Sequence, residues 1–393
     1  SMISIWQRSK SEVSDENCIA FYKEKYHEAK DPSALVRINA EGAVSYKAML
    51  FVPSEQNEMV FYADRKPGIT LYSNGVMIME SCEDLVHSYF SFVKGIVDSP
   101  DLSLNISREM LQHDRQLKII AANLEKKIKS ELEKLRDKDR EKYEKFFTAF
   151  GLQLKYGTVS DYGAHKDAVQ DLLMFWSEKE DKLITLQEYV TSMPVGQKHI
   201  YFASGENRAR IRQLPQAEPV REKGYDILLM TDEVDEFVTQ TLRSFMEKEF
   251  RNIAQDDLEL ETEEEKSKAQ ETAEEAKPVL EFIQKTLGEK VKEVRVSKSL
   301  RSHPVCLVPD ANMSFEMEKY MKRVNPEFNY TSGRILELNT GHAAFAAVKK
   351  AMETDGETAE KYAKLLYHQA LLIADLPLDD ATEYTDLVCS LMV

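Results

Sequence analysis

The sequence predicts a multidomain protein that combines α/β and α+β parts, and three observations support this fold class. Residues 35–80 alternate apolar and polar side chains with a period of two, which is typical of half-buried strands. Residues 109–136 repeat apolar side chains every three or four positions, which predicts an amphipathic helix. Residues 194–255 alternate strand and helix patterns, which predicts a small α/β unit with a parallel strand pair.

The N-terminal part is expected to form a meander of five short strands packed on helices. Their sequences are LVRIN, AVSYKAMLFV, MVFYA, ITLYS and VMIME. Asn74-Gly75 separates the last two and is a strong hairpin signal, because both positions of the favoured turn need a positive φ. A helix is expected over 84–97, where Ser81 and Asp84 form a weak capping box.

The first 258 residues are expected to form one domain with three parts. A large α/β subdomain covers 1–139, a helical segment covers 140–193 and a small α/β subdomain covers 194–258. The acidic stretch 256–277 is expected to be a solvated connecting helix, which we favour over an acidic interaction tail. Residues 259–393 then contain strands and helices, and they predict an α+β domain that ends in a helical bundle.

Composition and charge exclude several classes of function. The 393 residues suffice for two or three domains, and the net charge of −16 disfavours a nucleic-acid partner. The four cysteines form no disulfide or zinc-ligand spacing with the eight histidines, so no metal site is expected and a cytoplasmic location is the simplest. No apolar run reaches the ~18 residues of a membrane span, so no membrane partner is expected.

No common catalytic motif is present in the sequence. It lacks the glycine-rich nucleotide loops, the H-E-x-x-H metalloprotease motif and the G-x-S-x-G nucleophile elbow. The isolated histidines His87 and His342 are expected to be ordinary surface or core residues. The sequence therefore predicts no self-contained active site.

The segment 98–112 contains a good helix N-cap that is followed by a residue unfavourable to a helix start. Ser107 is a suitable N-cap, yet Arg108 follows it in the first helical turn, where the helix dipole disfavours a cation by ~0.3–1 kcal/mol. Either Arg108 pairs locally with Glu109 or Asp101, or it belongs to an anion site at the helix terminus.

Two C-terminal segments have unusual apolar faces. Met313, Met317, Tyr320 and Met321 share one helix face, which suits either core packing or an adaptable surface for varied apolar partners. The helix within 360–378 is apolar around most of its circumference, so it is either buried in a monomer or covered by a second copy. For the second case we expect a homodimer interface that contains Leu365, Leu366, Leu372, Leu387 and Leu391.

Several segments resemble one protein family. DSPDLSLNISREMLQ, preceded by SFVKGIV, closely resembles the catalytic-loop signature of the middle domain of the 90-kDa heat-shock protein chaperones. Similar stretches are IWQRSKSEVSDENCIAFYKE, YVTSMPVGQKHIYFASGEN and ILLMTDEVDEF, and residues 311–393 resemble the bacterial type. The resemblance covers essentially the whole chain, and we expect the family's N-terminal nucleotide-binding domain to be absent from it.

The resemblance implies roles for residues in two regions. Arg108 corresponds to the arginine that reaches the ATP γ-phosphate, and Gln112 corresponds to a polar partner of the nucleotide. Asn105 belongs to the same loop, in which Ser103 stands where many relatives have proline. Client-binding roles are implied for Trp6 and for the 313–321 face. Since the sequence reads Leu391-Met392-Val393 at its end, we expect no acidic MEEVD-like tail.

The resemblance implies a molecular chaperone that binds unfolded or partly folded clients as a homodimer through its C-terminal helices. ATP and Mg²⁺ would be cofactors of the full-length protein and not of this chain alone, which we expect to hydrolyse no ATP without the nucleotide-binding domain. The main alternative is a non-catalytic dimeric scaffold or adaptor protein. A free-standing hydrolase that uses scattered carboxylates is the weakest hypothesis.

Overall fold

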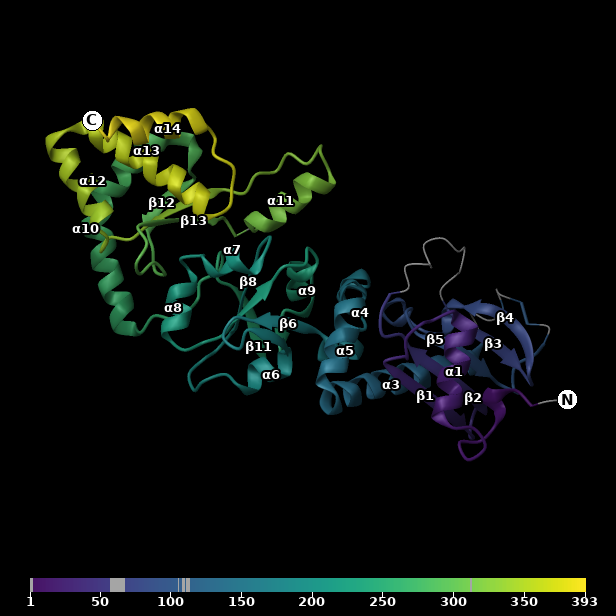
Figure 1. Cartoon of the computed structure of the whole chain (residues 1–393). Coiled ribbons are helices and arrows are strands. Elements are labelled where there is room, and N and C mark those ends of the chain that lie inside the picture. Colours follow the sequence, from purple (N-terminus) through teal and green to yellow (C-terminus); the bar gives the residue numbers. More distant parts are fainter. Residues whose placement is uncertain (1–2, 57–67, 105, 108–109, 111–113, 312) are drawn as a thin grey trace. The chain divides into compact units, whose positions relative to one another are not determined.

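The computed structural model describes residues 3–56, 68–104, 106–107, 110, 114–311 and 313–393 (Figure 1). Its backbone contacts divide the chain into two compact units, which are described separately here. The first unit comprises residues 1–174, 185–187 and 237–242, and the second comprises 175–184, 188–236 and 243–393.

The first unit contains a five-stranded sheet in the order β1-β2-β5-β3-β4. The strands are β1 (Ala34–Ala40), β2 (Tyr46–Val52), β3 (Ile69–Ser73), β4 (Val76–Cys82) and β5 (Lys94–Asp98). Four of the five predicted strands are confirmed, and the predicted strand at 59–63 lies outside the described residues. The predicted meander is wrong, because β5 inserts between β2 and β3 and runs parallel to β3.

The helix predicted over 84–97 is also wrong. The segment contains two short 3₁₀ turns, η3 (Glu83–Leu85) and η4 (Ser88–Phe90), followed by the strand β5. Because β5 is central, four of its five residues are buried and it shows no polar alternation. A short continuous apolar run of this kind cannot be distinguished from a buried helix by its periodicity.

The predicted hairpin turn between β3 and β4 is confirmed. Asn74 has a φ of 49° and Gly75 a φ of 79°, so both lie in the left-handed region that the turn requires. Ser73 and Val76 pair directly on either side of the turn. The local sequence rule was therefore sufficient to place this connection.

Among the residues that the structure describes, the first unit includes the helices α1 (Asp15–Tyr26), α3 (Arg115–Lys138), α4 (Arg140–Ser160) and α5 (Lys166–Val169). The 3₁₀ turn η5 (Gln170–Leu172) follows α5. The predicted apolar stripe of α3 is confirmed, with Leu117, Ile120, Leu124, Ile128 and Leu132 all buried. The helix begins at Arg115 and not near 109, because Asp114 caps it by accepting a hydrogen bond from the Leu117 N–H.

The predicted helical segment 140–193 is only partly helical. It also contains the strands β6 (Met174–Ser177) and β7 (Lys182–Thr185), which precede the short helix α6 (Leu186–Thr191). As in β5, the sequence of β6 is a short apolar run without alternation. These two strands form one edge of the six-stranded sheet β10-β11-β8-β9-β6-β7.

The second unit confirms the predicted small α/β arrangement. The strands β8 (Ile200–Ser204) and β9 (Ile227–Met230) pair in parallel, and the helices α7 (Arg208–Arg212) and α8 (Ala217–Glu222) lie between them in sequence. Two strands were not predicted: β10 (Ser244–Phe245) and β11 (Lys248–Asn252), of which β11 pairs in parallel with β8. The helix α9 (Asp235–Leu242) follows β9 in the sequence, as predicted, and its residues 237–242 belong to the first unit.

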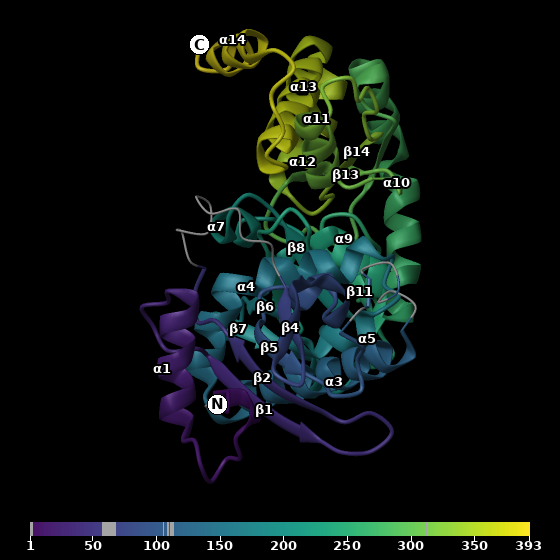
Figure 2. The same ribbon diagram turned by 90° about the vertical axis from the view of Figure 1, so that its right-hand side faces the viewer.

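The C-terminal part of the second unit has a three-stranded sheet in the order β12-β14-β13, which Figure 2 shows beside its helices. The predicted connecting helix is confirmed as α10, which Thr262 and Glu265 begin with a capping box. The elements are α10 (Glu263–Leu287), β12 (Glu293–Val296), β13 (Val305–Pro309), α11 (Phe315–Val324), β14 (Arg334–Leu338), α12 (Ala343–Thr354), α13 (Gly356–Ile373) and α14 (Ala381–Ser390).

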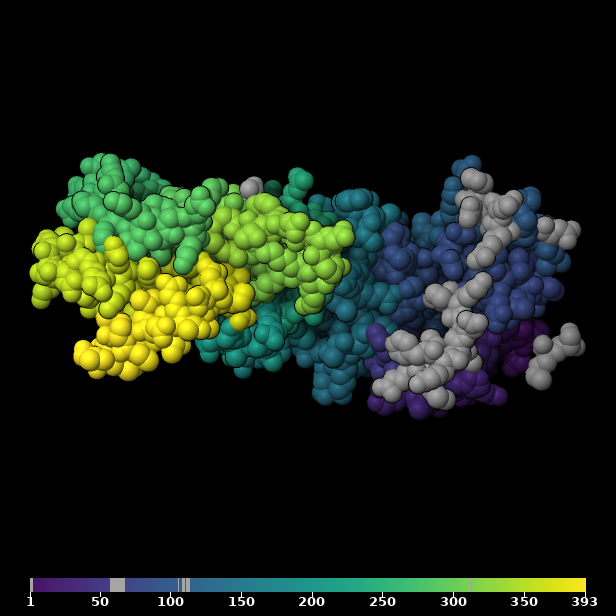
Figure 3. Space-filling model, turned by 90° about the horizontal axis from the view of Figure 1, so that it is seen from above, coloured from purple at the N-terminus to yellow at the C-terminus, as the bar shows by residue number. Residues whose placement is uncertain are grey.

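One hydrophobic core holds this C-terminal part together. It joins α10, α12 and α13 to the sheet through buried residues that include Ile283, Val348, Leu336 and Leu371. The helix α14 has no buried residue among those the structure describes, and it lies at the surface in the space-filling view (Figure 3). The predicted α+β arrangement with closing helices is thus present in residues 259–393.

Candidate functional site

A buried carboxylate stands at the end of β5, where the candidate catalytic loop begins. Oδ2 of Asp98 accepts hydrogen bonds from Trp6 Nε1 at 3.0 Å, Gln7 Nε2 at 2.9 Å and the Gly75 N–H at 3.0 Å. These donors come from the N-terminal segment and from the β3–β4 turn. The Asp98 side chain therefore connects the end of β5 to the N-terminal segment and to the β3–β4 turn.

The residues that follow Asp98 are held by further hydrogen bonds. The Ser99 N–H donates to the Tyr72 carbonyl at 3.1 Å, and the Ser99 hydroxyl donates to the Ser45 carbonyl at 2.7 Å. In return, the Ser45 N–H donates to Oδ2 of Asp101 at 2.9 Å. The Ser73 hydroxyl donates to the carbonyl of Leu102 at 2.7 Å. We call residues 98–102 the loop stem.

The predicted catalytic residues follow the loop stem directly. Asn105, Arg108 and Gln112 lie outside the residues that the structure describes. The Ser107 hydroxyl accepts a hydrogen bond from the Met110 N–H at 3.3 Å, which matches its predicted capping character. The structure thus describes the anchored base from which the three predicted residues extend, and their roles remain predictions.

Trp6 lies beside the loop stem and is half-buried. Its ring centroid is 4.8 Å from that of Tyr72 and 6.3 Å from that of Phe21, while its indole N–H is bonded to Asp98. The side chain is therefore fixed by both packing and hydrogen bonding. This position couples Trp6 to the conformation of the loop stem, and its predicted client contact is not tested by the structure.

The predicted methionine face on α11 is divided between core and surface. Ser314 caps the helix at Phe315, so the prediction that Met313 shares its face is wrong, because this residue precedes the cap. Met317 is buried, whereas Met313, Tyr320 and Met321 are each partly exposed. The neighbouring Glu318 is also buried and forms an ion pair of 3.0 Å with Arg334. The three partly exposed residues remain available for an apolar partner, and Met317 does not.

A buried acid joins the start of α11 to the end of β8. Glu236 accepts hydrogen bonds of 2.5 Å from the hydroxyls of Ser204 and Ser314. Burial raises the pKa of Glu236, and the two hydroxyl donors oppose that shift by stabilising its charged form. This contact positions α11 within the second unit.

The predicted interface leucines are similarly divided. Leu366 belongs to the C-terminal core with 6% of its surface exposed, and Leu365 is buried as well. In contrast, Leu372 is 45% exposed and Leu391 is 41% exposed, and Leu387 is partly exposed. Within one chain, therefore, only the latter three offer apolar surface to a partner.

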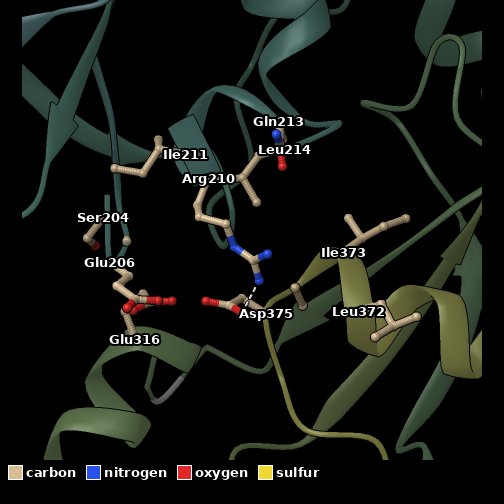
Figure 4. A pocket seen from close by; sticks show the side chains of 12 residues that line it. Ser204, Glu206, Arg210, Ile211, Gln213, Leu214, Glu316, Leu372, Ile373 and Asp375 are labelled. Atoms are coloured by element: carbon tan, nitrogen blue, oxygen red, sulfur yellow. Dashed lines mark hydrogen bonds and ion pairs between the residues drawn. The ribbon is translucent and has the colours of Figure 1, made fainter. Parts of the chain in front are cut away.

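A cavity of ≈ 320 Å³ lies in the second unit between the loop after β8 and the end of α13 (Figure 4). Arg210 and Asp375 form an ion pair across it, and Lys319 lies 3.6 Å from the same carboxylate. The lining that the structure describes contains no histidine or cysteine. Arg210 and Asp375 therefore balance each other's charge within this cavity.

Comparison with known proteins gives sequence matches over nearly the full chain. The family model described as Hsp90 protein matches residues 2–393. The chain is 49% identical over 393 residues to the chaperone protein HtpG of Bacillus subtilis. This match covers all of the present chain and 63% of the Bacillus protein. The chain is also 49% identical over 392 residues to HtpG of Clostridium acetobutylicum, of which it covers 62%.

The chain belongs to the Hsp90 family. It spans a little less than two thirds of the length of the HtpG chaperones that it matches. The resemblance seen in the sequence is therefore confirmed at the level of the family and of the bacterial HtpG type. Among the helices that the structure describes, none has the length and hydropathy needed to cross a bilayer.

Sequence reasoning did not find the role of Asp98 in this Hsp90 chain. Its partners Trp6 and Gln7 lie 92 and 91 positions earlier in the sequence, so no local pattern relates them. The usable signal was an acidic residue at the end of an apolar run, directly before Ser99-Pro100. A buried charge at such a place needs donors around it.

We predict that Asp98→Ala destabilises the first unit by about 2 kcal/mol, because three N–H donors lose their common acceptor and water can replace it only in part. Urea unfolding followed by Trp6 fluorescence in a Trp176→Phe background measures this change. The exposed residue Asp84 supplies the control variant Asp84→Ala, which should alter stability by less than about 0.5 kcal/mol. Equal stabilities of the two variants would contradict the anchoring role.

Proposed function

We propose that this chain supplies one side of a split ATPase site in an Hsp90-type chaperone. The observation that supports the proposal is the anchored loop stem, from which the segment that matches the family's catalytic loop extends. In this proposal the nucleotide is bound by the part of the longer HtpG relatives that this chain does not span. Arg108 would reach the γ-phosphate, with Asn105 and Gln112 as polar neighbours.

The chemistry of this role suits an arginine. A guanidinium stays protonated and presents several N–H donors, so it stabilises the charge that develops on the transferred phosphoryl group. In other nucleotide hydrolases such a residue contributes ~10³–10⁵ in rate. In this proposal the partner of the Arg108 cation is the nucleotide.

Mixing this chain with the separate nucleotide-binding domain of Bacillus subtilis HtpG should give weak ATP hydrolysis above that of the domain alone. We predict that Arg108→Ala removes this gain, because the developing charge loses its donor. The matched control is Arg115→Ala, which removes an exposed arginine from the start of α3 and should keep the gain. A steady-state phosphate-release assay measures all three rates, and an undiminished rate in Arg108→Ala would contradict the role.

We further propose that Tyr320 and Met321 on α11, together with Met313 just before its N-cap, bind unfolded or partly folded clients. Methionine side chains are flexible and polarisable, so one surface can adapt to different apolar segments. The buried Met317 is excluded from this surface and instead supports the helix from below. We propose that Trp6 also contacts clients, so that client binding and the conformation of the loop stem affect each other.

The double variant Tyr320→Glu with Met321→Glu should weaken the protection of a denatured protein against aggregation several-fold, because it places charge on the apolar surface. Light scattering of heat-denatured citrate synthase measures the protection. Leu152→Glu with Tyr156→Glu is a matched control, since both residues are 49% exposed on α4. Equal protection by both double variants, with melting temperatures unchanged, would contradict the proposed client surface.

We also propose that residues 259–393 form the dimerisation domain through α13 and α14. The support is the apolar surface that Leu372, Leu387 and Leu391 leave uncovered in one chain. A symmetric partner would cover the same residues on both copies, which is the usual solution for such a face. A match to chaperones over the whole chain does not favour the alternative of a non-catalytic scaffold.

We predict that the 45.2 kDa chain scatters light as a dimer and that Leu372→Glu with Leu391→Glu halves the measured mass. In a symmetric dimer the introduced carboxylates of the two copies would lie close together, so repulsion and the burial of charge would separate the subunits. The control is Val76→Glu with Met77→Glu, which adds the same charge to residues of β4 that are 53% and 54% exposed. A dimer that persists in the leucine variant would contradict this interface.

A further inference from the structure

Two histidines and an aspartate converge in the first unit, away from the loop stem. His87 precedes η4, Asp161 ends α4 and His165 precedes α5. One ligand atom from each lies within 4.8 Å of the others. The Nδ1 atom of His165 is 2.6 Å from Oδ2 of Asp161, and Nε2 of His87 is 3.8 Å from the same oxygen.

The backbone is shaped to bring these groups together. A Cβ atom on Gly157 would lie 2.3 Å from the Cβ of Tyr89, so η4 can approach α4 this closely only because residue 157 is glycine. The ring of Tyr89 in turn stacks on that of His87 at 4.2 Å. On the other side, Gly163 at a φ of 81° turns the chain back so that His165 faces Asp161.

Neighbouring groups orient the three side chains. The Gly163 N–H donates to Oδ1 of Asp161 at 3.1 Å, which leaves Oδ2 facing the two imidazoles. The Ser88 hydroxyl lies 3.2 Å from Nδ1 of His87, which leaves Nε2 facing Asp161. Outer contacts of this kind fix the ligands of metal sites in the same way.

We propose that His87, Asp161 and His165 form a binding site for a divalent transition-metal ion of the Zn²⁺ type, with a coordination position left to solvent. Two imidazoles and one carboxylate are ligands that Zn²⁺ prefers. Bonds of about 2.1 Å at tetrahedral angles separate two ligand atoms by about 3.4 Å, and the observed 2.6 and 3.8 Å bracket that value. The side chains are 31%, 21% and 48% exposed, so an ion can enter. A bound ion would tie η4 to the α4–α5 turn.

Calorimetric titration of the metal-free chain with Zn²⁺ tests the proposal. We expect one ion per chain, a visible d–d absorption of the tetrahedral type with Co²⁺, and a melting temperature that rises with Zn²⁺. His87→Ala and His165→Ala should each weaken binding by about 10- to 100-fold or more. The control His303→Ala removes a histidine that pairs with Glu218 alone at 3.0 Å, and it should bind as tightly as the unaltered chain.

Two results would overturn the site. The first is the absence of Zn²⁺ binding at micromolar free metal, which would make the cluster a hydrogen-bonded turn only. The second is binding of equal strength in the unaltered chain and in both histidine variants, which would place the ion elsewhere. Circular dichroism and melting of each metal-free variant show whether a loss of binding reflects unfolding.

Discussion

A carboxylate buried at the end of a central strand must be surrounded by donors, and Asp98 meets this constraint with three N–H groups on one oxygen. The donors come from the N-terminal segment and the β3–β4 turn, so the position of both depends on this side chain. The loop stem continues the same arrangement through Ser99 and Asp101. In the proposed function, a rigid base of this kind would lower the entropy cost of positioning the side chains that follow it.

The second unit is governed by a different constraint, which is the burial of α13. Its inner face enters the C-terminal core through residues such as Leu366 and Ala370, and this leaves Leu372 outside. The same division occurs in α11, where Met317 and Glu318 are buried and the remaining methionines are partly exposed. In both helices the inner residues pack into the core of the same chain, and some apolar surface stays exposed. In the proposed function, a client or a second copy would cover this surface.

Local sequence rules were reliable where one segment determines its own structure. Asn74-Gly75 placed a turn, the stripe from Leu117 to Leu132 placed α3, and the charged, helix-favouring stretch 256–277 indicated the helix α10. They failed for β5 and β6, because a short buried strand has no alternation to detect. They could not assign Leu366 and Leu372 to core and surface, since a helix that is apolar all round contains no such information. The partners of Asp98 are distant in sequence and only the folded chain shows them.

The anchoring of the loop stem requires that its hydrogen bonds persist in solution, and amide hydrogen exchange measures this directly. The N–H of Ser99 donates to Tyr72 and that of Ser45 donates to Asp101, so both should exchange as slowly as the amides of the central strand β5. The exposed residue Asp84 provides a fast-exchanging reference in the same unit. Exchange of Ser45 and Ser99 at the rate of an unprotected amide would contradict the claim that hydrogen bonds anchor the loop stem at the end of β5.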